Sequence, residues 1–231
     1  MVGKKMNAIV IVAPNKDNFL KYCIPGALRL AEASNAVVVT IREEAYGLEK
    51  TSGYNYKIFE KFQVQRYTDK FDRILRLDAD IVISPECPNI FALHPEDKLW
   101  VTFEDVGSRK KDRRGQMAIA QKALGLLPQW DKGYFNSGVV LTSKKHRELY
   151  NLDKRAIREI IKLPLGKYKE QSVLNHRARS LNFEIGDMGY KFNHLSMFKE
   201  NPRDSYIVHV AGKQSGKEGR MRELYRYWYG R

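Results

Sequence analysis

Residues 71–83 read FDRILRLDADIVI, and the interpretation of the whole chain starts from this stretch. Its first apolar residues predict a short buried strand, and the apolar run resumes after two acids. An unpaired charge is costly to bury, so Asp78 and Asp80 need either a cation or a position open to water. In an extended segment the two acids, separated by Ala79, point to the same side, where one divalent ion can contact both. Taken by itself, the pattern also fits a strand that runs into a solvated acidic turn.

Composition narrows the class of protein. The 231 residues suffice for one large domain (1–231), and the formal net charge of +14 favours anionic partners such as nucleic acid, acidic lipid or a phosphate-rich substrate. Cys23 and Cys87 are far apart and lack metal-site spacing, so a disulfide framework is not expected. The apolar run at 8–14 is too short for a signal peptide core or a membrane span, which predicts a cytoplasmic protein.

Strands and helices alternate at the start of the chain. Residues 7–14 predict a buried strand, residues 19–33 a helix and residues 36–41 a second buried strand. This β-α-β opening predicts the α/β class, with a parallel sheet covered by helices. Ligands of such sheets gather at the carboxyl ends of the strands, where Pro14 and Asn15 would lie close to the two acids.

The rest of the chain adds both kinds of element. We expect helices over residues 54–67, 115–124, 144–162, 170–179 and 217–231, and strands over residues 98–103, 134–142, 183–186 and 205–210. The polar trio at 136–138 predicts a bulge or a close approach to a ligand. Residues 109–114 (RKKDRR) predict a mobile surface loop or a lid over a negative ligand. The C-terminal helix is amphipathic, so it would either dock on the body or contact an anionic membrane surface.

Four separated segments resemble one known family. FDRILRLDADIVI, YFNSGVVLTSKKH, EQSVLNH and IVHVAGK follow the order and approximate spacing of family 8 glycosyltransferases, which include glycogenin and bacterial lipooligosaccharide galactosyltransferases. The resemblance extends from Asn7 to about Lys213. It implies a single-domain GT-A (Rossmann-like) fold with a mixed, mainly parallel sheet flanked by helices. It also implies a divalent ion, Mn²⁺ or Mg²⁺, and a nucleotide-sugar donor, with UDP as the expected nucleotide.

The resemblance makes Asp78, Asp80 and His209 the metal ligands. Two carboxylates and an imidazole leave coordination sites for two diphosphate oxygens, which suits six-coordinate Mn²⁺ or Mg²⁺. A lone histidine is more often a hydrogen-bonded core residue, but the D-x-D motif and the Gly212 and Lys213 that follow His209 favour a ligand here. The ion and nearby lysines would stabilise the charge that grows on the departing diphosphate.

Further site residues follow from the same resemblance. Lys61 lies where the family places a basic residue near the diphosphate or sugar, with Lys57 as its substitute; a solvated helix lysine is an equal alternative. Glu170 and Gln171 match an Asp-Gln pair that binds donor-sugar hydroxyls and lies near the anomeric carbon. Asn136 lies in the segment that lines the donor-sugar and acceptor side, or else it marks a structural bulge. These last three residues are the predicted catalytic group.

The predicted contacts of the nucleotide sugar are Pro14, Asn15, Lys61, Ala79, Gly212 and Lys213. Glu104 and Asp105 end another predicted strand, and either could bind sugar hydroxyls or act as a base. The family usually has a lysine three residues beyond its glycine, but this chain has Ser215 there. Lys213 or Lys217 would therefore take over the phosphate contact.

The resulting prediction is a metal-dependent glycosyltransferase, a hexosyl- or pentosyltransferase that moves a sugar from a UDP-sugar to a glycan or glycoprotein acceptor with retention. The alternative is a basic nucleic-acid-binding protein that uses residues 109–114 and the arginine-rich tail, with salt-dependent binding that ignores manganese. It is disfavoured because no nucleic-acid module is recognised and because Asp78 and Asp80 would repel phosphate unless a metal ion lies between them. A nucleotide-sugar hydrolase or pyrophosphorylase would need a Gly-rich loop that residues 14–17 lack.

Overall fold

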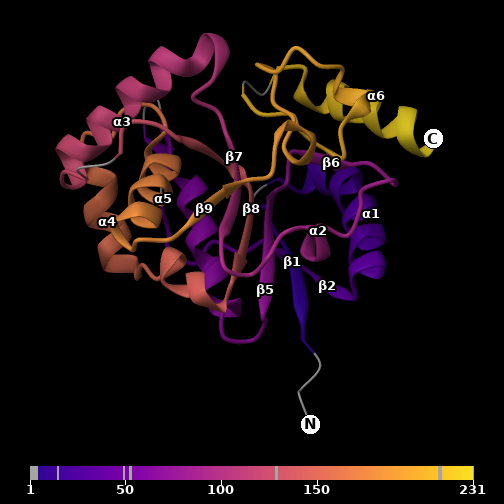
Figure 1. Ribbon diagram of the computed structural model, residues 1–231, viewed down its shortest axis with the longest axis horizontal. Coiled ribbons are helices and arrows are strands. Elements are labelled where there is room, and N and C mark those ends of the chain that lie inside the picture. Colours follow the sequence, from indigo (N-terminus) through magenta and orange to yellow (C-terminus); the bar gives the residue numbers. More distant parts are fainter. Residues whose placement is uncertain are drawn as a thin grey trace.

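A computed structural model of the protein describes residues 5–14, 16–48, 50–51, 54–127, 130–212 and 215–230. Asn15 and Lys213, both predicted to contact the nucleotide sugar, lie outside the described residues. A six-stranded sheet of strand order β2-β1-β5-β8-β7-β9 runs through the molecule, with helices on both sides (Figure 1). The predicted α/β class and the mixed, mainly parallel sheet are confirmed.

The strands of this sheet are β1 (Asn7–Val12), β2 (Ala36–Ile41), β5 (Arg73–Asp78), β7 (Leu99–Phe103), β8 (Phe135–Ser143) and β9 (Ile185–Asp187). Strand β1 is parallel to β2 and β5, and β7 is parallel to β9, whereas β8 is antiparallel to both neighbours. The carboxyl ends of β1 and β5 therefore lie beside the beginning of β8. Two antiparallel pairs lie apart from the sheet, β6 (Ile81–Ile83) with β10 (Ile207–His209) and β3 (Lys50–Thr51) with β4 (Tyr54–Asn55).

The helices are α1 (Asp17–Ser34), α2 (Ile90–Leu93), α3 (Lys110–Leu124), α4 (Lys154–Lys162), α5 (Lys169–Ser180) and α6 (Lys217–Tyr229), with 3₁₀ helices η1 (Tyr56–Tyr67), η2 (Gly107–Arg109), η3 (Lys144–Tyr150), η4 (Tyr190–Phe192) and η5 (Pro202–Asp204). Helices α1 and α6 gather on one side of the sheet and α3, α4 and α5 on the other (Figure 1). Successive side chains of β1 point to opposite faces of the sheet and so contribute to the core on both. Ile9 and Ile11 pack in the core on the α1 side, and Val10 packs in the core on the α5 side. None of the described helices combines the length and apolar character needed to cross a bilayer.

Several local predictions are corrected. Residues 109–114 are helical, since η2 ends at Arg109 and α3 begins at Lys110, so the predicted mobile loop is wrong. Residues 144–162 form η3 and α4 rather than one helix, because Asp153 caps α4 by accepting a hydrogen bond from Ala156 N at 2.7 Å. The predicted bulge is confirmed: between the pairs Trp100–Leu141 and Thr102–Asn136, β8 has more residues than β7.

The close approach of α1 to β6 gives a stability prediction. A Cβ atom at Gly26 would lie 2.7 Å from both the Cβ and the carbonyl oxygen of Ile83. We therefore expect Gly26→Ala to lower the free energy of unfolding by about 1–3 kcal/mol, as overpacking of a core does. The matched control is Gly219→Ala in α6, where no atom lies within 4 Å of the added carbon. Urea denaturation compares the two variants, and equal stabilities would contradict the predicted clash.

Candidate active site

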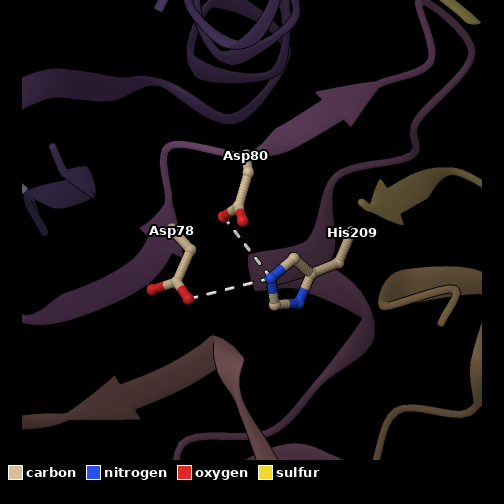
Figure 2. Close-up of side chains that lie close together, drawn as sticks. All are labelled: Asp78, Asp80 and His209. Carbon is tan, nitrogen blue, oxygen red and sulfur yellow. Dashed lines mark ion pairs between the residues drawn. The ribbon is translucent and has the colours of Figure 1, made fainter. Parts of the chain in front are cut away.

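Asp78, Asp80 and His209 meet at the carboxyl edge of β1 and β5. Asp78 is the last residue of β5, Asp80 precedes β6, and His209 is the last residue of β10. His209 Nε2 lies 3.7 Å from Asp78 Oδ2 and 3.5 Å from Asp80 Oδ1 (Figure 2). The β6–β10 pair brings the histidine here, since His209 pairs with Ile81 and the amide of Val210 donates to the carbonyl of Asp80 at 2.9 Å.

This cluster fits a divalent metal ion. One ligand atom from each of the three residues lies within 4.8 Å of the others, and no second such group occurs among the described residues. Asp80 Oδ1 is buried and accepts no hydrogen bond, so a cation beside it would satisfy an otherwise unpaired oxygen. Carboxylate oxygens with an imidazole nitrogen suit Mn²⁺ or Mg²⁺.

Asn136 orients the histidine. Its Oδ1 accepts hydrogen bonds from the amide of Gly138 at 2.8 Å, from Asn193 Nδ2 at 3.0 Å and from His209 Nδ1 at 3.1 Å. Because a carbonyl oxygen only accepts, Nδ1 carries a proton, and Nε2 is the ring nitrogen that faces the aspartates. A ring nitrogen held this way is typical of metal-binding histidines. Asn136, predicted as catalytic, thus lies beside the cluster with its oxygen engaged in positioning His209.

Each aspartate also pairs with a buried cation. Asp78 Oδ1 accepts from Arg76 Nη1 at 2.7 Å, and Asp80 Oδ2 accepts from Lys217 Nζ. Burial opposes ionisation of both acids, but Lys61 and Arg76 lower the pKa of Asp78. Lys16, His209 and Lys217 likewise hold the pKa of Asp80 well below its usual value, against its burial. Both side chains are therefore anions, as metal ligands must be.

Lys61 links the metal cluster to Glu170. Its Nζ lies 3.0 Å from Asp78 Oδ2, 3.2 Å from Glu170 Oε2 and 3.1 Å from Ser137 Oγ. This residue is buried and partnered, unlike a solvated helix lysine. Burial raises the pKa of Glu170 against the opposing effect of Lys61, and Glu170 Oε1 has no hydrogen-bond partner. Gln171 Oε1 accepts from the amide of Ser137 at 3.1 Å and from Asn136 Nδ2 at 3.2 Å, so Gln171 is connected to the cluster through Asn136.

Of the two acids that follow β7, one joins the site and the other does not. Glu104 is 1% exposed and is bound by Arg113, by Gln171 Nε2 at 2.6 Å and by Asn136 Nδ2 at 3.2 Å. Asp105 instead accepts hydrogen bonds from the backbone and lines a separate cavity, so the prediction that it serves the sugar site is wrong. Arg113 is a site residue that sequence reasoning missed, because its segment was taken for a loop.

A cavity of about 690 Å³ opens over the cluster, and its walls include most of the predicted residues. The predicted residues along it are Lys61, Asp78, Asp80, Asn136, Glu170, Gln171, His209 and Gly212. Pro14 lies instead along a neighbouring cavity of about 50 Å³, together with Lys16 and Lys57. Both cavities share Lys61 and Asp78, so they meet at the same edge of the sheet. Ala79 is fully buried and is not among the residues that line either cavity.

Comparison with known proteins gives a family match. The model of glycosyl transferase family 8 matches residues 10–211 of the 231-residue chain, a span that contains the whole metal cluster. No curated protein sequence matches the chain.

Solved structures share the fold at low sequence identity. A glycosyltransferase involved in glycosylation of the major capsid of PBCV-1 is 13% identical, with a TM-score of 0.63 over 95% of this chain and 100% of that chain. The galactosyltransferase LgtC in complex with donor and acceptor sugar analogues is 15% identical, with a TM-score of 0.53 over 96% of both chains. Mouse xyloside xylosyltransferase 1 is 12% identical, with a TM-score of 0.52 over 91% of this chain and 98% of that chain. These likenesses confirm the GT-A fold.

Proposed function

Since the chain belongs to glycosyl transferase family 8 and is a glycosyltransferase of GT-A fold, we propose that it transfers a sugar from a UDP-sugar to a glycan or glycoprotein acceptor. The observation that carries the proposal is the buried Asp78–Asp80–His209 cluster at the floor of a 690 Å³ cavity. Asp78, Asp80 and His209 would hold Mn²⁺ or Mg²⁺. When bound, such an ion neutralises the charge that develops on a leaving diphosphate.

The surrounding residues have separate tasks in this proposal. Lys61 supplies a buried positive charge between Asp78 and Glu170, next to where the diphosphate would lie. Glu170 has one unpaired oxygen, which can accept a hydrogen bond from a sugar hydroxyl. Gln171 is fixed by Glu104 and Ser137, so its amide would be held in place beside a bound donor sugar. Asn136 keeps His209 in the tautomer that binds the ion.

Retention of the anomeric configuration is part of the proposal. An inverting enzyme needs a free carboxylate as base, but the described acids along the cavity are paired with cations. Glu104 pairs with Arg113, Glu170 with Lys61, and Asp112 with Arg113. Analysis of the product linkage by NMR tests this point, and an inverted product would contradict it.

A thermal-shift panel tests donor and metal together. We expect one UDP-sugar with Mn²⁺ to raise the melting temperature by about 5 °C at 100-fold excess over its Kd, because ligand binding stabilises the native state by mass action. The same sugar nucleotide with EDTA should give little shift. No shift with any nucleotide sugar, together with a shift with oligonucleotides, would favour the nucleic-acid-binding alternative instead.

A further inference from the structure

The two aspartates of the metal cluster differ in a way that the proposed function does not require. Arg76 holds Asp78 Oδ1 at 2.7 Å, while Asp78 Oδ2 faces His209 Nε2 at 3.7 Å. Lys217 holds Asp80 Oδ2, while Asp80 Oδ1 faces the same nitrogen at 3.5 Å. Asp78 has a cation at each oxygen, since Lys61 Nζ lies 3.0 Å from its Oδ2, whereas Asp80 has one oxygen fixed by Lys217 and the other without a hydrogen-bond partner.

Lys217 is held rigidly in this role. It is 3% exposed, and its Nζ lies 5.8 Å from the centre of the Phe19 ring. Helix α6, which begins at Lys217, packs on α1, where the ring centres of Tyr22 and Tyr225 lie 5.8 Å apart and Met221 joins the buried core. At its other end, the hydroxyl of Tyr229 donates to the carbonyl of Ile83 at 2.8 Å. The ammonium group is held against Asp80 Oδ2, and Lys217 is not among the residues that line the substrate cavity.

The carboxylates of the site are already compensated by positive side chains before any ion enters. Asp78, Asp80 and Glu170 pair with Lys61, Arg76 and Lys217, and the charge of Lys16 also acts on both aspartates. A divalent ion by itself would add two uncompensated positive charges, and Lys217 would lie close to it. A nucleoside diphosphate brings the negative charge that removes this repulsion.

We propose that Lys217 is a specificity-determining residue of the metal site, which restricts Asp80 to one-oxygen coordination and disfavours a bare ion relative to an ion bound to diphosphate. One-oxygen coordination suits the six-coordinate Mn²⁺ and Mg²⁺, whereas Ca²⁺ takes more oxygens and often binds a carboxylate through both. Lys217 therefore selects for the smaller ions and makes their binding depend on the nucleotide. This inference rests on the proposed function, since it assumes that the cluster binds a metal.

The test measures ion binding directly, without an activity assay. Binding of Mn²⁺ to the full chain is followed by loss of the free-ion EPR signal, with and without UDP, and Ca²⁺ is measured by competition. We expect Lys217→Met to bind bare Mn²⁺ about tenfold more tightly and Ca²⁺ about 100-fold more tightly than the wild type. The ratio of Mn²⁺ affinity to Ca²⁺ affinity should therefore fall, and UDP should raise the Mn²⁺ affinity by a smaller factor than it does in the wild type. Lys217→Gln also removes the charge, and its affinity for bare Mn²⁺ should rise likewise if the Met variant fails to fold.

The matched control is Lys21→Met, which removes one positive charge and an α6 ion pair but lies on the exposed surface of α1. It should bind both ions as the wild type does. The inference is overturned if the Lys217 variants bind ions like the wild type, or if Lys21→Met changes affinity by the same factor. If the wild type binds no Mn²⁺ even with UDP, the proposed metal site fails and the inference fails with it.

Discussion

Replacement of Asp80 by asparagine is expected to lower the affinity for UDP with Mn²⁺ by at least about 100-fold, because even residues that only support metal ligands typically contribute 10- to 100-fold. The change keeps the shape of the side chain but removes the anionic oxygen that faces His209 at 3.5 Å. It also leaves Lys217 buried beside a neutral group, so we expect the free energy of unfolding to fall by about 3 kcal/mol. Calorimetry measures binding, and urea denaturation measures stability.

A double variant separates these two effects. Asp80→Asn combined with Lys217→Met removes both charges of the buried pair, so it should regain most of the lost stability. It should not regain binding, because the metal ligand is still missing. Unchanged affinity for UDP with Mn²⁺ in Asp80→Asn would rule out Asp80 as a ligand of the metal ion. Loss of binding without recovery of stability in the double variant would mean that the Lys217 pair does not stabilise the fold.

The local parts of this site could be read from the sequence. The apolar run of β5 ends at Asp78, and the rule that ligands gather at the carboxyl ends of parallel strands places that residue at the site. The lysine at 61 and the pair at 170–171 were predicted from the family resemblance, and all of them line the cavity. Asn15 and Lys213, which were predicted to contact the nucleotide sugar, lie outside the described residues.

The parts that depend on pairing between distant elements could not be predicted from local pattern. Only the β6–β10 pair explains why His209 lies beside Asp80, and only the packing of α6 on α1 brings Lys217 to the same carboxylate. Glu104 and Asp105 both follow the end of β7, and of the two Glu104 lines the cavity over the metal cluster. Nothing in their own sequence showed that it would be Glu104. Arg113 was missed because a run of charges was taken for a loop, although the same residues form the first turns of a helix.

Gly138 is the second position where a single substitution should strongly weaken metal binding. A Cβ atom there would lie 2.1 Å from His209 Cε1 and 2.2 Å from His209 Nδ1. The ring is buried and held by Asn136, so it can yield only by leaving its position against the aspartates. We therefore expect Gly138→Ala to weaken Mn²⁺ binding by at least about 100-fold and to lower stability by about 1–3 kcal/mol.

Two comparisons identify the cause as the clash with the histidine. Gly115→Ala in α3 adds the same atom where nothing lies within 4 Å, so it should leave Mn²⁺ binding unchanged and raise stability by about 0.5–1 kcal/mol. In the His209→Ala background the ring is gone, and Gly138→Ala should then cost far less stability than it does in the wild type, a non-additivity that residues in contact show. Two outcomes would contradict this explanation: additive losses of stability for Gly138→Ala and His209→Ala, or normal Mn²⁺ binding by Gly138→Ala. Either would mean that the absence of a side chain at Gly138 is not what keeps His209 in the metal cluster.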